Sequence, residues 1–211
     1  MDKKALRERV RRLTGIRMSE IVSDGAIDEL VNDAYREVCG VEDWPFLFFE
    51  GQAPLEAGKA EVALPTELRR VSAASVDGHR LVEVTVNDLD VLDDEPGDPQ
   101  VYARLDDSRL MVWPPPEAAG QVELRGYRQV VALAAETDEP VFAAEFHPTV
   151  AYAAASRLLV EEADDTDRPA AFGQEAGQGA SAMRQRYMAT ADTAPFTIGG
   201  RRSSRRRRWR L

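Results

Sequence analysis

The chain has 211 residues, of which 44% are hydrophobic, so it can bury a sizeable core and is too apolar to be a disordered chain. One cysteine, Cys39, excludes an intramolecular disulfide, and two histidines make no Cys/His cluster of the kind that binds zinc. The formal net charge of −10 averages over two unlike parts, because residues 201–211 hold seven arginines and no acid. The remaining 20 basic and 37 acidic residues give positions 1–200 a net charge of −17, so we expect an acidic body with a basic arm that seeks anions.

Neither a targeting segment nor a membrane span is expected. The first residues lead into a mixed-charge stretch without an apolar segment. The longest apolar-rich run, 150–160, is too short to cross a bilayer. These features predict a soluble protein that is made and used in a reducing cytoplasm and has no membrane partner.

Two helices are predicted at the start of the chain. The first spans 3–13 and ends at Thr14-Gly15, and the second runs from Ser23 to Val38. Ser23 is a suitable N-cap, and Gly40 stands where a C-terminal cap is expected. The apolar positions of the second helix share one face: Ile27, Leu30, Val31, Ala34, Tyr35 and Val38.

An aromatic segment follows at 44–49, with the sequence Trp-Pro-Phe-Leu-Phe-Phe. Five large apolar residues in six positions need burial, and a proline here ends any helix. We interpret the segment as a core plug between the helices and the next layer rather than as an exposed docking patch, because large exposed apolar patches are rare.

The middle of the chain has the pattern of strands and turns. Asp77-Gly78 and residues 106–108 each separate two apolar-rich runs and predict two β-hairpins. We expect five to seven short, mostly antiparallel strands among the following ranges: 60–64, 71–76, 80–86, 101–105, 109–113 and 121–130.

Helical periodicity returns near Pro148, which suits a first helical turn. The stripe of the third helix consists of Phe146, Val150, Ala154 and Leu158. A fourth helix is predicted over about 169–191, and its stripe consists of Phe172, Ala176, Ala180, Met183 and Tyr187. Its three glycines weaken it, so it needs tertiary packing or ends early.

This order of elements predicts an α+β fold: a four-helix bundle with an inserted, mostly antiparallel β-rich domain and an extended C-terminal arm. The expected divisions are 1–43 for the N-terminal helices of the bundle, 44–132 for the inserted domain, 133–192 for the C-terminal helices, and 193–211 for the arm.

No arrangement of residues in the sequence predicts catalysis. His79 lies in a turn and His147 at a helix start, and neither has a partner at metal-ligand spacing. Cys39 has acidic neighbours that disfavour a reactive thiolate, so we interpret it as a small buried hydrophobe. We therefore expect a protein that is not an enzyme and needs no cofactor or metal. Acidic residues at 161–165 sit unfavourably at a helix C-terminus, which indicates a basic partner surface.

The arm carries the strongest local signal. Arginine forks bind phosphate and carboxylate, and Trp209 can stack on a ring or insert into a pocket. Pro195 and the Gly199-Gly200 pair indicate an extended tether. The arm is consistent with docking on an acidic protein partner, with DNA binding, or with a solubility tail that has no partner. The candidate partner-binding residues are Pro195, Phe196, Ile198, Arg201, Arg202, Arg205, Arg206, Arg207, Arg208, Trp209 and Arg210.

The stretch from Ile27 to Phe49 reads Ile-Asp-Glu-Leu-Val-Asn-Asp-Ala-Tyr-Arg-Glu-Val and then, after five residues, Trp-Pro-Phe-Leu. It resembles the N-terminal part of head-to-tail adaptor (connector) proteins of tailed bacteriophages. The downstream order is also similar: a β insertion, the motifs at 140–142 and 146–148, an alanine-rich helix and a long helix ending in Met, Arg and Tyr. The likeness in organisation covers about Asp24 to Tyr187.

The resemblance implies a structural virion protein at the head–tail junction, made in the cytoplasm of the bacterial host. Such adaptors form a ring, usually of twelve copies, beneath the portal protein, extend the DNA channel and present a platform for tail or nozzle and stopper proteins. Their C-terminal segment reaches the portal, so here residues 194–211 would be the portal-docking arm. The strong basicity of this arm leaves contact with the genomic DNA as the alternative.

Overall fold

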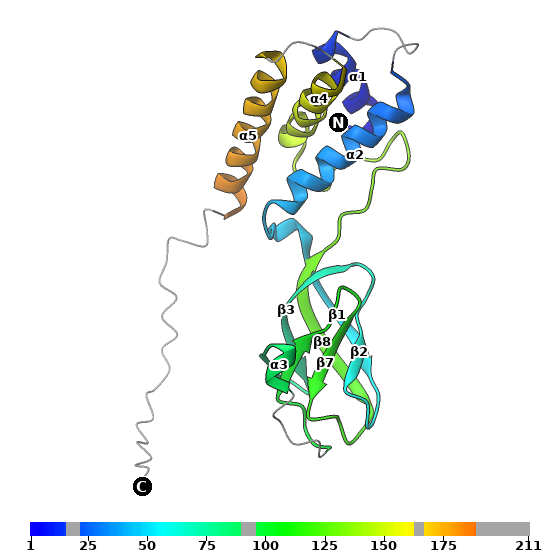
Figure 1. Ribbon diagram of the computed structural model, residues 1–211, viewed down its shortest axis with the longest axis vertical. Helices are drawn as coiled ribbons and strands as arrows, with labels where there is room; N and C mark the ends of the chain where they lie inside the picture. Colours follow the sequence, from blue (N-terminus) through cyan, green and yellow to red (C-terminus); the bar gives the residue numbers. More distant parts are fainter. Residues whose placement is uncertain (16–21, 90–95, 163–166, 189–211) are drawn as a thin grey trace, which may run out of the picture.

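The fold is α+β, as predicted, in a computed structural model that describes residues 1–15, 22–89, 96–162 and 167–188. Helices gather at one end of an elongated molecule and strands at the other (Figure 1). Two chain segments, 41–47 and 129–133, join the ends, and we call this junction the waist. Each end has its own hydrophobic core.

The two N-terminal helices begin and end through capping interactions. In α1 (Lys3–Thr14), Asp2 accepts a hydrogen bond from the Ala5 amide, and Gly15 closes the helix in the left-handed region at φ 77°. In α2 (Asp24–Gly40), Ser23 accepts from the Ala26 amide, as its predicted N-cap role requires. The prediction for Gly40 is wrong: the helix continues through Gly40, and the capping residue is Val41 in a right-handed conformation.

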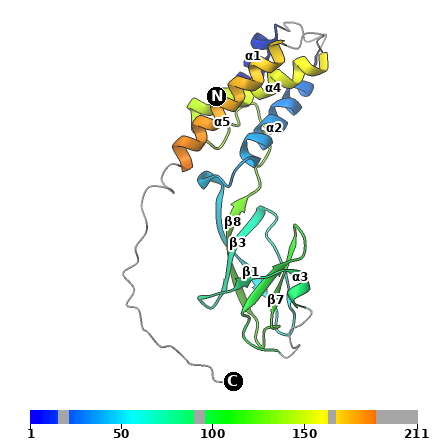
Figure 2. The same ribbon diagram turned by 60° about the vertical axis from the view of Figure 1, so that its left-hand side comes forward.

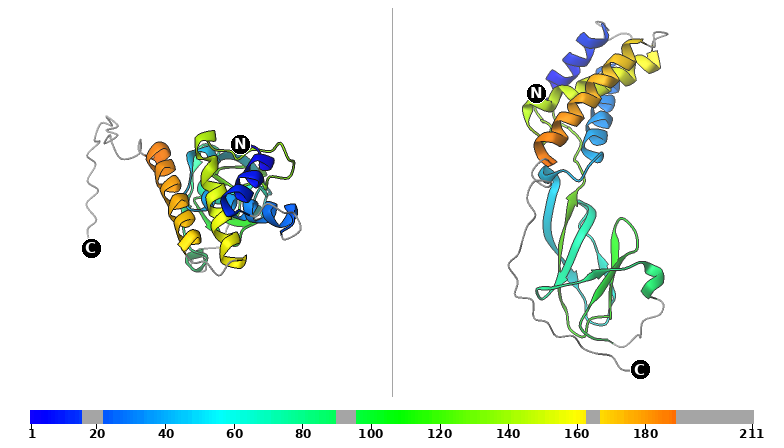
Figure 3. Two further views of the ribbon diagram at one scale, coloured as in Figure 1. Left: turned by 90° about the horizontal axis from the view of Figure 1, so that it is seen from above. Right: turned by 90° about the vertical axis from the view of Figure 1, so that its left-hand side faces the viewer.

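The two C-terminal helices are α4 (His147–Glu162) and α5 (Asp167–Met188). Helix α4 packs against α1, α2 and α5, and it lies between α5 and the α1–α2 pair (Figure 3). Its small residues Ala151, Ala154 and Ala155 are fully buried, which permits this close approach of helices. Helix α5 is less enclosed, since Met183 is the one buried member of its predicted stripe and the others are half-buried.

The strands form two four-stranded sheets that pack against each other around the second core (Figure 2). The first sheet has the order β1-β8-β3-β4, with β1 at Phe48–Leu55, β8 at Gly120–Arg128, β3 at Leu68–Val76 and β4 at His79–Arg80. The second has the order β2-β7-β6-β5, with β2 at Glu61–Ala63, β7 at Arg109–Trp113, β6 at Val101–Arg104 and β5 at Val82–Glu83. One helical turn, α3 (Val86–Leu89), follows β5.

Both predicted hairpins are present, but the strand predicted over 80–86 is divided. After Arg80 the chain leaves the first sheet, and Val82 and Glu83 pair in parallel with β6 of the second sheet. Strand β1 was not predicted from the sequence. Its first residues belong to the aromatic segment, and Pro54 lies within the strand. Proline is tolerated there because β1 is an edge strand and pairs only with β8.

Candidate docking surfaces

All the predicted arm residues, from Pro195 to Arg210, lie outside the described residues, which end at Met188. The structure describes the last turn of α5, which precedes the predicted arm in the chain. This turn lies at the waist, beside the start of the β part (Figure 3).

Aromatic contacts fix the last turn of α5. The Tyr187 ring meets the rings of Phe46, Phe146 and Trp44 at centroid distances of 5.0, 6.1 and 6.2 Å. Its hydroxyl accepts a hydrogen bond of 3.0 Å from the Ala143 amide. Two arginines of the same turn form ion pairs, Arg184 with Glu42 and Arg186 with Glu145. Sequence periodicity placed Tyr187 on a packed face but gave no signal for this role at the root of the arm.

The aromatic segment is largely the predicted core plug. Trp44 is completely buried, its Nε1 donates to the Val38 carbonyl oxygen at 3.0 Å, and its ring stacks on Phe46 with centroids 5.7 Å apart. Leu47 and Phe49 are buried as well, whereas Phe48 is 46% exposed. The plug therefore joins the helical core to the start of β1, and Phe48 alone presents a large aromatic surface.

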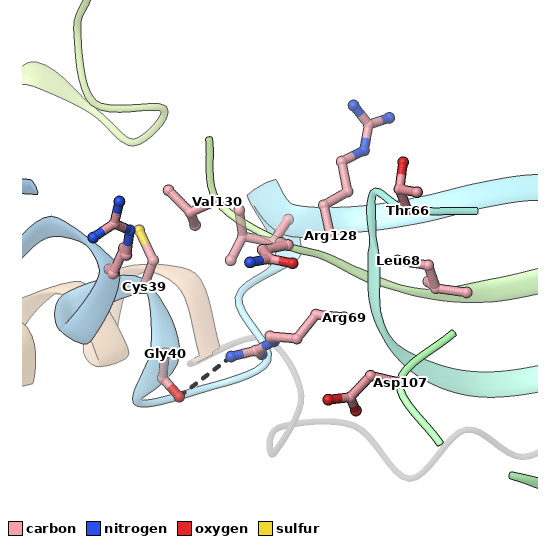
Figure 4. Close-up of a pocket in the computed structure, with 11 residues that line it drawn as sticks. Cys39, Gly40, Thr66, Leu68, Arg69, Asp107, Arg128 and Val130 are labelled. Carbon is pink, nitrogen blue, oxygen red and sulfur yellow. Dashed lines mark hydrogen bonds between the residues drawn. The ribbon is translucent and has the colours of Figure 1, made fainter. Parts of the chain in front are cut away.

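A charged clamp crosses the waist on the other side of this segment. Asp43 accepts from Arg69 at 3.0 Å and from Arg70 at 2.6 Å, so one carboxylate holds two neighbouring arginines of β3. Arg69 also donates to the Gly40 carbonyl oxygen at the end of α2, where a cation is favourable (Figure 4). We call these three residues, Asp43, Arg69 and Arg70, the Asp43 clamp.

A pocket of about 340 Å³ lies behind the clamp, between α2 and strands β3 and β8. Leu47, Leu68 and Val130 give it apolar walls, and the Arg128 guanidinium extends away from Arg69 (Figure 4). Because Arg69 and Arg128 point apart, these two side chains do not form an anion site together (Figure 4). The pocket lies between the helical and β parts, so at this side of the waist the contacts are the polar ones of the clamp.

A second hollow of about 340 Å³ lies between α2, α4 and α5. We call it the helical groove. Most of its walls are small or apolar, with Val38 from α2, Val41 directly after it, and Ala153, Ala176 and Ala180 from α4 and α5. The ion pair between Glu37 and Arg157 also lines it. Val41 is 54% exposed there. No sequence pattern indicated this groove, because it depends on how three helices pack.

The two histidines and the cysteine were the candidates for chemical reactivity in the sequence. His147 is buried, and its ring nitrogens contact the Met1 amino group at 2.5 Å and the Phe142 carbonyl oxygen at 3.0 Å. Burial raises the pKa of the Cys39 thiol to about 12, which disfavours the thiolate. His79 is exposed in the β3–β4 hairpin. Cys39 is thus the buried hydrophobe that was predicted, although burial rather than acidic neighbours sets its pKa.

The described residues contain no group of three metal-ligating side chains that could hold a metal ion. Within the same ranges, no helix combines the length and apolar character that crossing a membrane requires.

In a comparison with protein families, residues 1–209 match the family described as SU10 adaptor protein. No curated protein matches the chain. The match spans the helical and β parts and most of residues 193–211, and it confirms the resemblance drawn from Ile27 to Phe49 and from the order of the downstream elements. The chain therefore belongs to the SU10 adaptor protein family, whose members are structural adaptors of the phage virion.

Proposed function

We propose that this protein is the head-to-tail adaptor of a phage, forming a ring beneath the portal protein, extending the DNA channel and providing the platform for tail attachment. Its C-terminal arm, residues 193–211, docks on the portal. Family membership over residues 1–209 carries the proposal. The partners are the portal protein, tail or nozzle and stopper proteins, and further copies of this chain, twelve to a ring.

The distribution of charge supports this function. A channel that lets DNA slide has to interact weakly with phosphate, and residues 1–200 carry a net charge of −17. The seven arginines of 201–211 supply the opposite charge on a tether that leaves the waist at Tyr187. In a ring, identical arms engage together, so weak individual contacts add up to firm attachment.

Deletion of residues 201–211 tests the role of the arm. We expect the truncated protein to fold with unchanged thermal stability, since it retains every described residue, and to lose attachment to the portal in a pull-down of purified proteins. Replacing all seven arginines with lysine is the matched control. It preserves the charge and removes the planar forks, so it separates the effect of charge from that of bidentate hydrogen bonding. Virions completed normally with the truncated protein would refute portal docking by the arm.

The oligomeric state tests the ring. Native mass spectrometry of the protein alone and mixed with purified portal protein should give a monomer in the first sample and a closed ring in the second. A protein that remains monomeric on the portal contradicts the adaptor ring.

The alternative is a DNA-binding or packaging accessory protein that uses the arm on phosphates. It predicts duplex DNA binding with a steep negative dependence on salt concentration that disappears on deletion of 201–211. Trp209→Ala separates the two functions, because portal docking through a pocket needs the indole, whereas phosphate contacts by arginine persist without it.

A further inference from the structure

The helical groove is bordered by a stretch of α5 that has few charged residues. Residues 169–183 carry a single charged side chain, Glu175, in a protein with 30% charged residues. Much of this stretch is exposed, and it borders a hollow that also exposes Val41. Exposed helix faces are normally polar, so this stretch has the composition of a contact surface.

Two glycines of α5 have different surroundings. A Cβ at Gly179 would overlap the Thr149 side chain, so close packing of α4 and α5 explains that glycine. A Cβ at Gly177 would meet nothing within 4 Å, although Gly177 lines the groove. Glycine weakens a helix relative to alanine, and no contact among the described residues accounts for Gly177. Its absent side chain keeps the groove open.

We propose that in the unassembled protein this groove binds the chain's own segment 193–198, with Pro195, Phe196 and Ile198 against the groove wall. The inference goes beyond the proposed function, because it concerns the free chain and holds whether the arm later meets a portal or DNA.

The length of the chain beyond α5 suits this occupant. Ala180 and Gly173 mark the groove at about 12 and 22 Å from Met188 along the helix, at about 1.5 Å per residue. Residues 189–192 suffice for a reversal, and the next residues at about 3.3 Å each bring Phe196 level with the groove. Between 189 and 200 the large apolar side chains are Phe196 and Ile198, so segment and groove match in character.

Charge favours the same direction. A segment that runs back along α5 from Met188 carries the arginines of 201–210 towards the start of that helix. The sequence between α4 and α5 is acidic there, with four carboxylates among residues 161–165. Along the bound segment the apolar residues come first and the arginines second. Along α5 from Met188 the groove comes first and the acidic sequence second, so the two orders match.

Such binding holds the arginines against an acidic body until a stronger partner competes for them. The free protein would then expose less of its basic arm to nucleic acid in the cell, and a partner would release it by mass action.

A spin label tests the contact in the full chain. Thr193→Cys accepts a nitroxide selectively, because Cys39 is buried and the pKa of its thiol is raised. We expect paramagnetic loss of the amide NMR peaks of Ala153, Gly177 and Ala180. The loss should disappear with Phe196→Ser/Ile198→Ser, which keeps the tether, and with Gly177→Lys, which fills the groove. Gln178→Lys on the adjacent, exposed position is the matched control and should leave the loss intact.

Three outcomes would overturn the proposal. The groove peaks could remain sharp in the labelled chain, or they could broaden equally in the Phe196→Ser/Ile198→Ser variant, which would reduce the effect to tethering. In a mixture of unlabelled ¹⁵N protein and labelled ¹⁴N protein, broadening between molecules would assign the groove to the arm of a second copy instead.

Discussion

Trp44 and Phe48 stand four residues apart in one aromatic segment, yet Trp44 is fully enclosed and Phe48 is 46% exposed. The difference follows from their elements. Trp44 precedes a short 3-10 turn (Pro45–Leu47) that directs it into the helical core, whereas Phe48 begins β1 on the outward face of the first sheet. Composition alone gave both residues the same expectation of burial.

Trp44→Ala should lower the free energy of unfolding by about 3–5 kcal/mol, since it removes a fully buried ring and leaves a cavity between the helical core and the waist. Phe48→Ala is the matched control and should lower it by only about 1 kcal/mol, because its ring is already half in water and loses mainly its edge contact with Tyr127. Urea unfolding followed by circular dichroism measures both. Equal losses for the two variants would contradict the assigned burial.

The buried thiol of Cys39 predicts a dependence of stability on alkaline pH. Its folded pKa, raised to about 12 by burial, lies above the ordinary value of 9.0, so the unfolded chain releases the proton first. The stabilisation is complete below pH 9 and decreases as the pH rises from 9 towards 12. Cys39→Ala should make the decrease of the urea midpoint over this range less steep. Part of the decrease should remain in the variant, because burial also raises the pKa of Tyr35 to about 12. An unchanged slope in the variant would contradict a buried thiol.

At the scale of elements, two glycines of α5 that are two residues apart should respond to alanine with opposite signs. Gly179→Ala forces α4 and α5 apart at Thr149 and should destabilise the protein by about 1–3 kcal/mol. Gly177→Ala enters open space within the helix and should stabilise it by about 1 kcal/mol. Thermal unfolding measures the stability of each variant relative to the parent protein. A stability change of the same sign for both variants would refute the packing of α5 on α4.

The sequence predicts most of the local structure correctly. The Ser23 cap, the α2 stripe and the hairpin at Asp77-Gly78 depend on contacts within a few residues, so the local pattern is sufficient to find them. The separation of the strands into two sheets is different, because Val82 crosses to pair with Val101 of the other sheet. Such a pairing depends on tertiary packing that no local pattern records.

The same distinction applies to the candidate surfaces. A run of arginines is visible in the sequence itself, so the arm is predicted from composition, and it stays a prediction because its residues lie outside those described. The Asp43 clamp joins Asp43 to Arg69 and Arg70, 26 and 27 residues away, and the helical groove needs three helices in register. Neither could be found before the fold placed these residues together.

At the scale of the whole molecule, two hydrophobic cores are joined through the waist, where the described contacts are mainly the polar Asp43 clamp and the aromatic plug. Junctions without a large hydrophobic interface permit relative motion of the two parts. The clamp spans this junction, so we expect it to restrain the angle between the helical and β parts.

Asp43→Ala should widen the range of this angle while both cores stay folded. Small-angle X-ray scattering should then show a broader distance distribution at an unchanged circular dichroism spectrum. Asp33→Ala, which removes a surface carboxylate paired with Arg36 on the same helix, is the control and should leave the scattering curve unaltered. Identical curves for the parent and Asp43→Ala would show that the clamp does not hold the waist.

The β part enters and leaves the helical part through neighbouring strands, since Phe48 at the start of β1 pairs directly with Tyr127 near the end of β8. Two chain ends that lie side by side can receive a different insert without any change in the helices that carry them. A lineage could thus exchange the β part while keeping its helical part constant. For protein engineering, the pair Phe48 and Tyr127 marks where a foreign β module could be grafted.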